Sequence, residues 1–219
     1  MRGWKRSGVE PHLKLKLDLH VHTNKSSDAH TRLDQLVPNI QRAGLDGLAI
    51  TDHNMLATET LEETLIIPGI EISSRDGHII GLGIPSPIPR GLSADETIRE
   101  IRNMGGVSIV AHPYDMFRSA IKPDILTAMP DAIEVINSAS ILHSVTWKRA
   151  RTFAKERRLS QTAGSDSHIP DTIGKAFTTI ECESKTIASV LDGIRKGATT
   201  PNGQAYSLGD RLRKLARRN

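Results

Sequence analysis

The sequence has few of the features expected of a secreted or membrane protein. It holds one cysteine, Cys182, so no disulfide can form within the chain and an oxidising compartment is not required. No apolar stretch approaches the ~20 residues of a membrane-spanning helix, and residues 1–12 contain no apolar run of the kind found in signal peptides. We therefore expect a cytoplasmic protein that makes no membrane contact.

Aromatic residues are also scarce, at 3% of the chain, while 37% hydrophobic and 25% charged residues are typical of a folded globular protein. The length of 219 residues suits one domain. The net charge of +4 is uneven, because residues 195–219 hold seven Lys and Arg against one Asp, whereas residues 17–194 hold 17 basic and 23 acidic residues. An acidic body suits cations. The basic ends could bind a polyanion. The alternative is that their Lys and Arg residues only keep exposed termini solvated.

Strand-like and helix-like segments alternate along the chain, which predicts an α/β fold with a mainly parallel sheet in a single domain. Leucines alternate with polar residues over residues 13–20, as in a strand with one buried face. Residues 93–96 (SADE) have the form of a capping box and predict the start of a helix. The expected strands are 13–20, 47–51, 66–73, 78–84, 107–111, 132–136, 161–164 and 177–181, and the expected helices are 31–44, 93–104, 186–197 and 207–218.

The basic C-terminal end is predicted to be a separate tail. We expect a barrel domain over residues 1–200 and a helical tail over residues 201–219, with the turn-forming sequence PNG (201–203) between them. Leu208, Leu212 and Leu215 recur at helical spacing in this tail and form a narrow apolar stripe among basic residues.

Metal-ligating residue types lie at or just after the C-terminal ends of the expected strands. These residues are His20, His22, His53, Glu71, His112, Asp166 and His168. In a parallel barrel the carboxyl ends of the strands meet on one face, so side chains distant in sequence come together there. The pair His20 and His22 alternates as in a strand, which points both imidazoles to one side. Imidazole and carboxylate ligands without thiolates suit zinc, manganese or iron.

Seven short motifs that surround these residues carry a family resemblance. They are DLHVHTNKSSD (18–28), AITDHN (49–54), PGIEIS (68–73), GHIIGLG (77–83), VAHP (110–113), IEVIN (133–137) and AGSDSH (163–168). In this order they resemble the PHP family, named for polymerase and histidinol phosphatase. The resemblance implies a distorted (βα)7 TIM-like barrel with a trinuclear metal site, and phosphoester hydrolysis as the usual activity.

The resemblance also implies a set of ligands for up to three divalent metal ions. It assigns His20, His22, Glu71 and Asp166 to the first metal, Glu71, His78 and His112 to the second, and Asp28, His53 and His168 to the third. Asp28 stands where some relatives use histidine. Glu71, Asp166 and His20 are the expected catalytic centre, where a hydroxide would lie between the first two metals.

The expected function is hydrolysis of phosphomonoesters or phosphodiesters by metal-activated water. The substrate would be a phosphorylated small metabolite, a nucleotide or a short oligonucleotide. Ser26, Arg118 and Asn137 are candidate substrate-binding residues, and Asp18 and Asp52 are candidates for orienting the ligand imidazoles.

Two other functions remain open. The basic tail suits a non-catalytic RNA-binding or nuclease-associated subunit, in which the tail contacts single-stranded nucleic acid. An amidohydrolase also places two histidines after its first barrel strand, but the TDHN, Glu71 and GSDSH motifs fit the phosphoesterases better.

Overall fold

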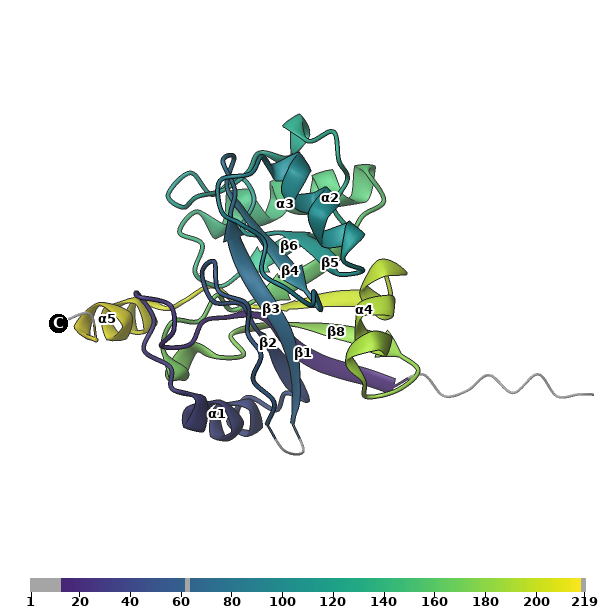
Figure 1. The fold of residues 1–219 in the computed structure, drawn as a ribbon. Helices are drawn as coiled ribbons and strands as arrows, with labels where there is room; N and C mark the ends of the chain where they lie inside the picture. The colour runs from purple at the N-terminus through teal and green to yellow at the C-terminus, as the bar shows by residue number, and fades with distance from the viewer. Residues whose placement is uncertain (1–12, 62–63, 218–219) are drawn as a thin grey trace, which may run out of the picture.

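The computed structural model describes residues 13–61 and 64–217. Within them, one sheet has nine strands: β1 (Leu13–Val21), β2 (Gly47–Ile50), β3 (Leu65–Ser73), β4 (His78–Leu82), β5 (Val107–Val110), β6 (Ala132–Asn137), β7 (Ser160–Gly164), β8 (Ala176–Cys182) and β9 (Thr199–Gly203). The helices are α1 (Leu36–Arg42), α2 (Ala94–Asn103), α3 (His143–Glu156), α4 (Ile187–Arg195) and α5 (Leu208–Ala216), with short 3-10 turns at Leu33–Gln35, Pro123–Ile125 and Pro170–Thr172. Figure 1 shows their arrangement.

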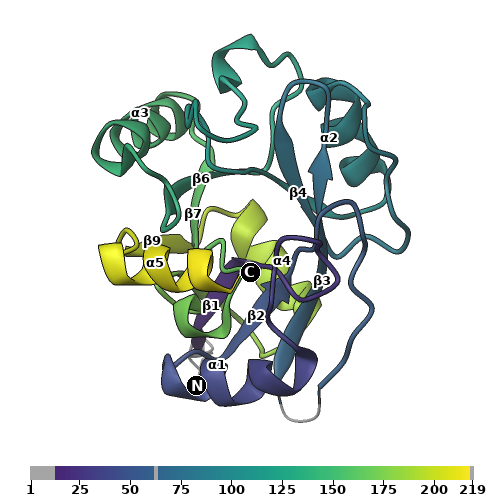
Figure 2. The same ribbon diagram turned by 90° about the vertical axis from the view of Figure 1, so that its left-hand side faces the viewer.

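The sheet curls into a nearly closed barrel. Its strand order is β7-β6-β5-β4-β3-β2-β1-β8-β9, so β1 to β7 lie side by side in chain order. A parallel bridge between Val21 and Ser167 brings the segment after β7 back to β1, and the His22 N–H donates to the Ser167 carbonyl at 2.8 Å. The predicted α/β barrel class is confirmed, as Figure 2 shows from the side of α5.

The sheet differs from the prediction in strand direction and strand count, because it has nine strands, whereas the sequence pattern predicts eight and the family resemblance implies seven. Strand β4 runs antiparallel to both β3 and β5, and β8 runs antiparallel to both β1 and β9. Only residues 74–77 join β3 to β4, and a parallel crossover needs a dozen or more, so the two strands form a hairpin. Strand β9 was not predicted because it contains Pro201 and Gly203, which are tolerated at the edge of a sheet.

Side-chain caps form at the starts of three helices. The Ser93 hydroxyl accepts from the Glu96 N–H and the Glu96 carboxylate accepts from the Ser93 N–H, so the predicted capping box forms before α2. Ser207 forms a second capping box with Asp210 before α5, and the Thr186 side chain caps α4 by accepting from the Ser189 N–H. Pro38 lies in the first turn of α1, where no backbone donor is needed. Helix α3 was not predicted.

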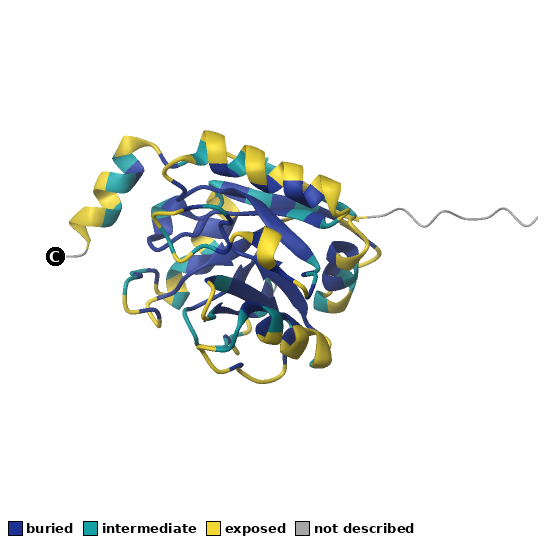
Figure 3. Ribbon diagram, turned by 90° about the horizontal axis from the view of Figure 1, so that it is seen from above, coloured by how far each residue is buried: buried dark blue, intermediate teal, exposed yellow. Residues whose placement is uncertain are grey.

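The core lies between the strands and the inner helix faces. Figure 3 shows the strands largely buried and the outer faces of the helices exposed. Among residues 13–61 and 64–217, none of the helices combines the length and apolarity needed to cross a bilayer.

The C-terminal helix is fixed to the barrel by polar contacts rather than by its leucines. The Tyr206 N–H donates to the Ser138 carbonyl at 2.7 Å, and Lys175 Nζ lies 3.2 Å from Oδ2 of the buried Asp210. The predicted stripe is exposed instead, since Leu208, Leu212 and Leu215 are 73%, 56% and 56% accessible. Residues 201–203, expected to separate the tail from the body, pair with β8, so α5 follows directly from the sheet.

These contacts predict that Asp210 is a stability residue. Asp210→Ala removes the carboxylate of the capping box and the partner of Lys175, so we expect a loss of about 1–3 kcal/mol in the free energy of unfolding, measured with urea. Asp192→Ala, which removes an exposed ion pair with Lys196, is the control and should change this free energy by less than about 0.5 kcal/mol. Equal stability of wild type and Asp210→Ala would show that α5 is not held as described.

Candidate metal centre

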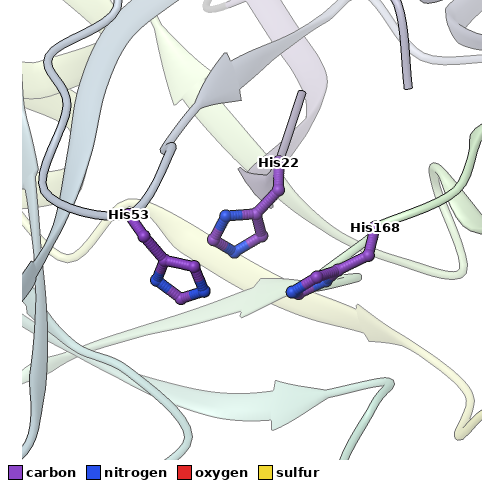
Figure 4. Close-up of side chains that lie close together, drawn as sticks. All are labelled: His22, His53 and His168. Carbon is purple, nitrogen blue, oxygen red and sulfur yellow. The ribbon is translucent and has the colours of Figure 1, made fainter. Parts of the chain in front are cut away.

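The predicted metal ligands converge at one end of the barrel. His20 and His22 lie at the end of β1, His53 follows β2, and Glu71 lies near the end of β3. His78 opens β4, and because β4 runs in the opposite direction, its first residue lies at the same end as the last residues of the parallel strands. Figure 4 shows His22, His53 and His168 pointing toward one another from three separate segments.

Glu71 is the centre of this cluster. Its side chain is only 1% accessible, so its carboxylate is almost completely buried. The two carboxylate oxygens lie 2.8–3.4 Å from ring nitrogens of His20, His22, His53, His78 and His112. One carboxylate therefore contacts members of all three ligand sets that the resemblance implies.

Asp166 is a second buried carboxylate in the cluster. Its Oδ1 lies 3.8 Å from His20 Nε2, 3.5 Å from His22 Nε2 and 3.4 Å from His168 Nδ1. Its Oδ2 lies 2.7 Å from Arg118 Nη2, so the two side chains form an ion pair. Asp166 has a φ of 55°, a left-handed conformation that is costly for a residue other than glycine and is typical of functional sites.

Asp28 joins the cluster from the loop after β1. Its Oδ2 lies 3.1 Å from His168 Nε2, and its Oδ1 lies 3.7 Å from His53 Nε2. All nine predicted ligands thus lie within one continuous group of contacts, and the three residues expected to bind the third metal are neighbours.

The hydrogen-bonding groups of the cluster do not satisfy one another, and the unpaired atoms are of the kinds that bind divalent cations. Among the described residues, several buried ligand atoms have no hydrogen-bond partner: His20 Nε2, His22 Nε2, Asp28 Oδ1, Glu71 Oε2 and Asp166 Oδ1. Three sets have ligand atoms that all lie within 4.8 Å of one another: His22, His53 and His168; His20, His22 and Glu71; and His53, Glu71 and His78. Unpaired buried polar atoms are costly, so this pattern favours bound cations.

The electrostatics of the cluster favour ionised carboxylates. Burial opposes ionisation of Glu71, but the charges of His20 and His78 hold its pKa well below the usual range. Burial likewise opposes ionisation of Asp166, yet Arg118 and His20 hold its pKa well below the usual range. Burial, aided by the charge of His168, lowers the pKa of His22 to about 3. Deprotonated carboxylates and a neutral imidazole are the forms that bind metals.

Glu134, which the sequence pattern does not indicate, contacts two of the predicted ligands. Its side chain is buried in β6, where Oε1 lies 3.0 Å from His20 Nδ1 and Oε2 accepts from the backbone N–H of His112 at 2.7 Å. His112 has a φ of 30°, so this hydrogen bond stabilises an unusual backbone conformation. The available signal was a single acidic residue within the otherwise apolar stretch AIEVI (132–136).

Asp18 and Asp52 hold the backbone around the ligands instead of contacting imidazoles directly. Asp18 accepts from the N–H groups of His20, Ser165 and Gly174, and burial raises its pKa to about 6. Asp52 accepts from the Thr23 N–H and from the Ser26 hydroxyl.

The three candidate substrate-binding residues have different surroundings. Ser26 is buried, and its Oγ lies 3.3 Å from His22 Nδ1 and accepts from the His53 N–H at 3.0 Å. Asn137 is buried, and its amide donates to Glu134 at 2.9 Å and to Asp166 at 3.0 Å. These two therefore belong to the scaffold under the ligands. Arg118 differs because it lines the cavity above them.

A cavity of about 540 Å³ lies over the cluster. It is lined by Asp28, His53, His78, Phe117, Arg118, Ser119, Ala139, Ile141, Tyr206, Arg211, Lys214 and Leu215. The last four come from α5 and the segment before it. Their place at the site could not be predicted, because the helical spacing of residues does not show where a helix packs.

Comparisons with known proteins agree with this geometry. The PHP domain model matches residues 18–129, and the PHP-associated model matches residues 147–199. The uncharacterized protein MJ1587 of Methanocaldococcus jannaschii is 33% identical over 141 residues, which cover 57% of this chain and 82% of the relative.

Two solved structures share the fold. A two-domain protein from Bacteroides vulgatus that contains a predicted PHP-like metal-dependent phosphoesterase has a TM-score of 0.67 at 17% identity, covering 98% of this chain and 74% of the other. The lesion-specific endonuclease PfuEndoQ from Pyrococcus furiosus has a TM-score of 0.68 at 15% identity, covering 93% of this chain and 66% of the other. With its ordered motifs, its barrel and the family model matched over half its length, the chain belongs to the PHP family.

Proposed function

We propose that this protein is a metal-dependent phosphoesterase that hydrolyses a phosphomonoester or phosphodiester of a small metabolite, nucleotide or short oligonucleotide. The observation that carries the proposal is the buried carboxylate of Glu71 within 3.4 Å of five imidazoles, with unpaired ligand atoms around it. A structural core has no need for such a group, whereas a cation cluster that binds phosphate does.

The nine ligands would hold up to three divalent ions. His20, His22, Glu71 and Asp166 would bind the first, Glu71, His78 and His112 the second, and Asp28, His53 and His168 the third. Nitrogen and oxygen donors suit zinc, manganese or iron. When bound, such ions lower the pKa of water from 15.7 toward about 7 and neutralise charge on phosphate oxygens.

The chain's own residues would orient and retain the substrate. Arg118 lines the cavity with 21% of its side chain accessible, so its guanidinium can donate to a phosphate oxygen while Asp166 fixes its position. Glu134 would hold the imidazole of His20 through Nδ1, which leaves Nε2 directed at the cluster. The catalytic centre of this proposal is formed by Glu71, Asp166 and His20.

A second candidate is a protein that binds single-stranded nucleic acid through the basic C-terminal helix. It is favoured by Arg211 and Lys214, which lie at the cavity, and by the endonuclease among the structural relatives. The two functions are compatible if the helix guides a nucleic acid end to the metal centre. A purely non-catalytic RNA-binding role leaves the convergence of nine ligands without a purpose.

The central test is metal-dependent hydrolysis. We expect purified protein to contain bound divalent metal and to hydrolyse a chromogenic phosphoester, with rates lowered more than about 100-fold by His20→Ala or Asp166→Ala. His143→Ala on α3 is the matched control and should keep wild-type rates, because His143 is not among the ligands. A salt-dependent RNA complex that survives a metal chelator, formed by protein without metal or hydrolytic activity, would support the non-catalytic alternative instead.

Glu134 generates a separate prediction about metal affinity. Glu134→Gln keeps the shape of the side chain, but both carboxylate oxygens of Glu134 are used: Oε1 lies at His20 Nδ1, and Oε2 accepts from His112 and Asn137. An amide has only one acceptor oxygen, so its NH2 group must replace one of these acceptors. We expect about 10- to 100-fold weaker metal binding by titration, with activity recovering at high metal concentration. Glu156→Gln, an exposed residue of α3, is the control. Unchanged affinity in Glu134→Gln would exclude the positioning role.

A further inference from the structure

Three exposed apolar side chains line the cavity above the metal cluster, and we call them the apolar wall: Phe117, Ile141 and Leu215. They are 62%, 52% and 56% accessible, and they come from three separate segments: the loop after β5, the loop after β6 and helix α5. Exposed apolar side chains scattered singly need no explanation, but three that converge on a functional cavity mark a binding surface.

Phe117 is the most exposed of the three phenylalanines, since Phe153 is buried and Phe177 is partly buried. Phenylalanine is usually buried in folded proteins, so the exposure of Phe117 is unusual. Aromatic faces bind other flat rings by stacking, and this contact tolerates different kinds of ring.

The part of the wall on α5 is held in place by the fold. Arg211 donates through Nη1 to the Ala139 carbonyl at 3.3 Å and through Nη2 to the Ser140 carbonyl at 3.0 Å, which ties α5 to the loop that carries Ile141. The Tyr206 hydroxyl donates to the Ser165 carbonyl at 2.8 Å, directly beside Asp166. The helix is therefore an element of the site's wall, and it lies beyond one end of the barrel (Figure 1).

The cavity has a polar part and an apolar part, which suit different parts of a substrate. Asp28, His53 and His78 mark its metal-binding part, and Arg118 adds a cation, so a phosphate group is suited to that part. The apolar wall offers neither charge nor hydrogen bonds, so it suits the part of the substrate that lies beyond the phosphate.

We propose that the apolar wall binds an aromatic ring carried by the alcohol portion of the phosphoester, and that Phe117 and Leu215 determine this specificity. The proposal rests on the proposed phosphoesterase function and adds the chemical class of its substrate. A nucleobase and a simple aryl group share the required flat apolar face, so the experiment must separate them.

The test compares three probes that carry the same phosphate group: phenyl phosphate, adenosine 5′-monophosphate and glycerol 3-phosphate. Binding is measured by calorimetry and hydrolysis by phosphate release, for wild type, Phe117→Ala and Leu215→Ala. We expect wild type to prefer at least one ring-bearing probe over glycerol 3-phosphate. Each wall variant should weaken binding or raise KM for that probe about 5- to 30-fold, and should change the values for glycerol 3-phosphate by less than about twofold. Preference for adenosine 5′-monophosphate alone identifies a nucleobase, and equal preference identifies any aryl ring.

Leu208→Ala and Met116→Ala are matched controls. Leu208 lies on the same helix as Leu215, and Met116 is the neighbour of Phe117, and they are 73% and 83% accessible without lining the cavity. Both controls should behave as wild type with all three probes. Equal effects of the wall variants on every probe, or no ring preference in wild type, would overturn the proposal. If wild type binds the ring-bearing probes selectively but hydrolyses none of them, the phosphoesterase function is contradicted and the proposed role of the apolar wall is supported.

Discussion

The site depends on a single constraint: a carboxylate, Glu71, is buried among five imidazoles at the end of the barrel. A buried charge is costly unless it is paired, and a neutral imidazole pairs with a carboxylate only when its ring nitrogen carries the proton. Among the described residues, one atom of each of four side chains has no hydrogen-bond partner: His20 Nε2, His22 Nε2, Glu71 Oε2 and Asp166 Oδ1. Divalent cations satisfy both kinds of donor atom at once, so the arrangement has a physical reason as a metal centre.

The barrel makes this concentration of polar groups possible. Parallel strands deliver the residues after β1, β2, β5 and β7 to one end, and the reversed direction of β4 delivers its first residue, His78, to the same end. A hydrogen-bonded scaffold then fixes the ligands. Glu134 connects His20 with the backbone of His112, and Asn137 connects Glu134 with Asp166. The apolar core thus ends at a layer of satisfied polar groups that supports the ligands.

Much of the fold, and most of the residues that converge at the end of the barrel, could be predicted because they depend on local chemistry. Capping at Ser93 and the leucine alternation of β1 are signals within a few residues. Ligand residue types at strand ends predicted seven of the nine residues that converge, and only the family resemblance added Asp28 and His78. The antiparallel direction of β4 follows from the short loop between β3 and β4. The strand pattern locates the strands but does not by itself give their directions.

Contacts between distant segments could not be predicted in this way. The pairing of β9 with β8, the supporting role of Glu134 and the docking of α5 at the cavity each join residues far apart in the chain. The apolar stripe of α5, the most regular pattern in this segment, is exposed, whereas Asp210 is buried. Polar anchoring through one buried carboxylate therefore outweighed the hydrophobic pattern of a short helix.

The most direct test of the metal centre is anomalous diffraction from crystals grown with manganese or zinc. The account predicts anomalous peaks, up to three in number, at about 2.0–2.3 Å from the carboxylate oxygens of Glu71 and from the imidazole nitrogens around it. Crystals without such peaks, in which these imidazoles and carboxylates hydrogen-bond only to one another or to water, would contradict it.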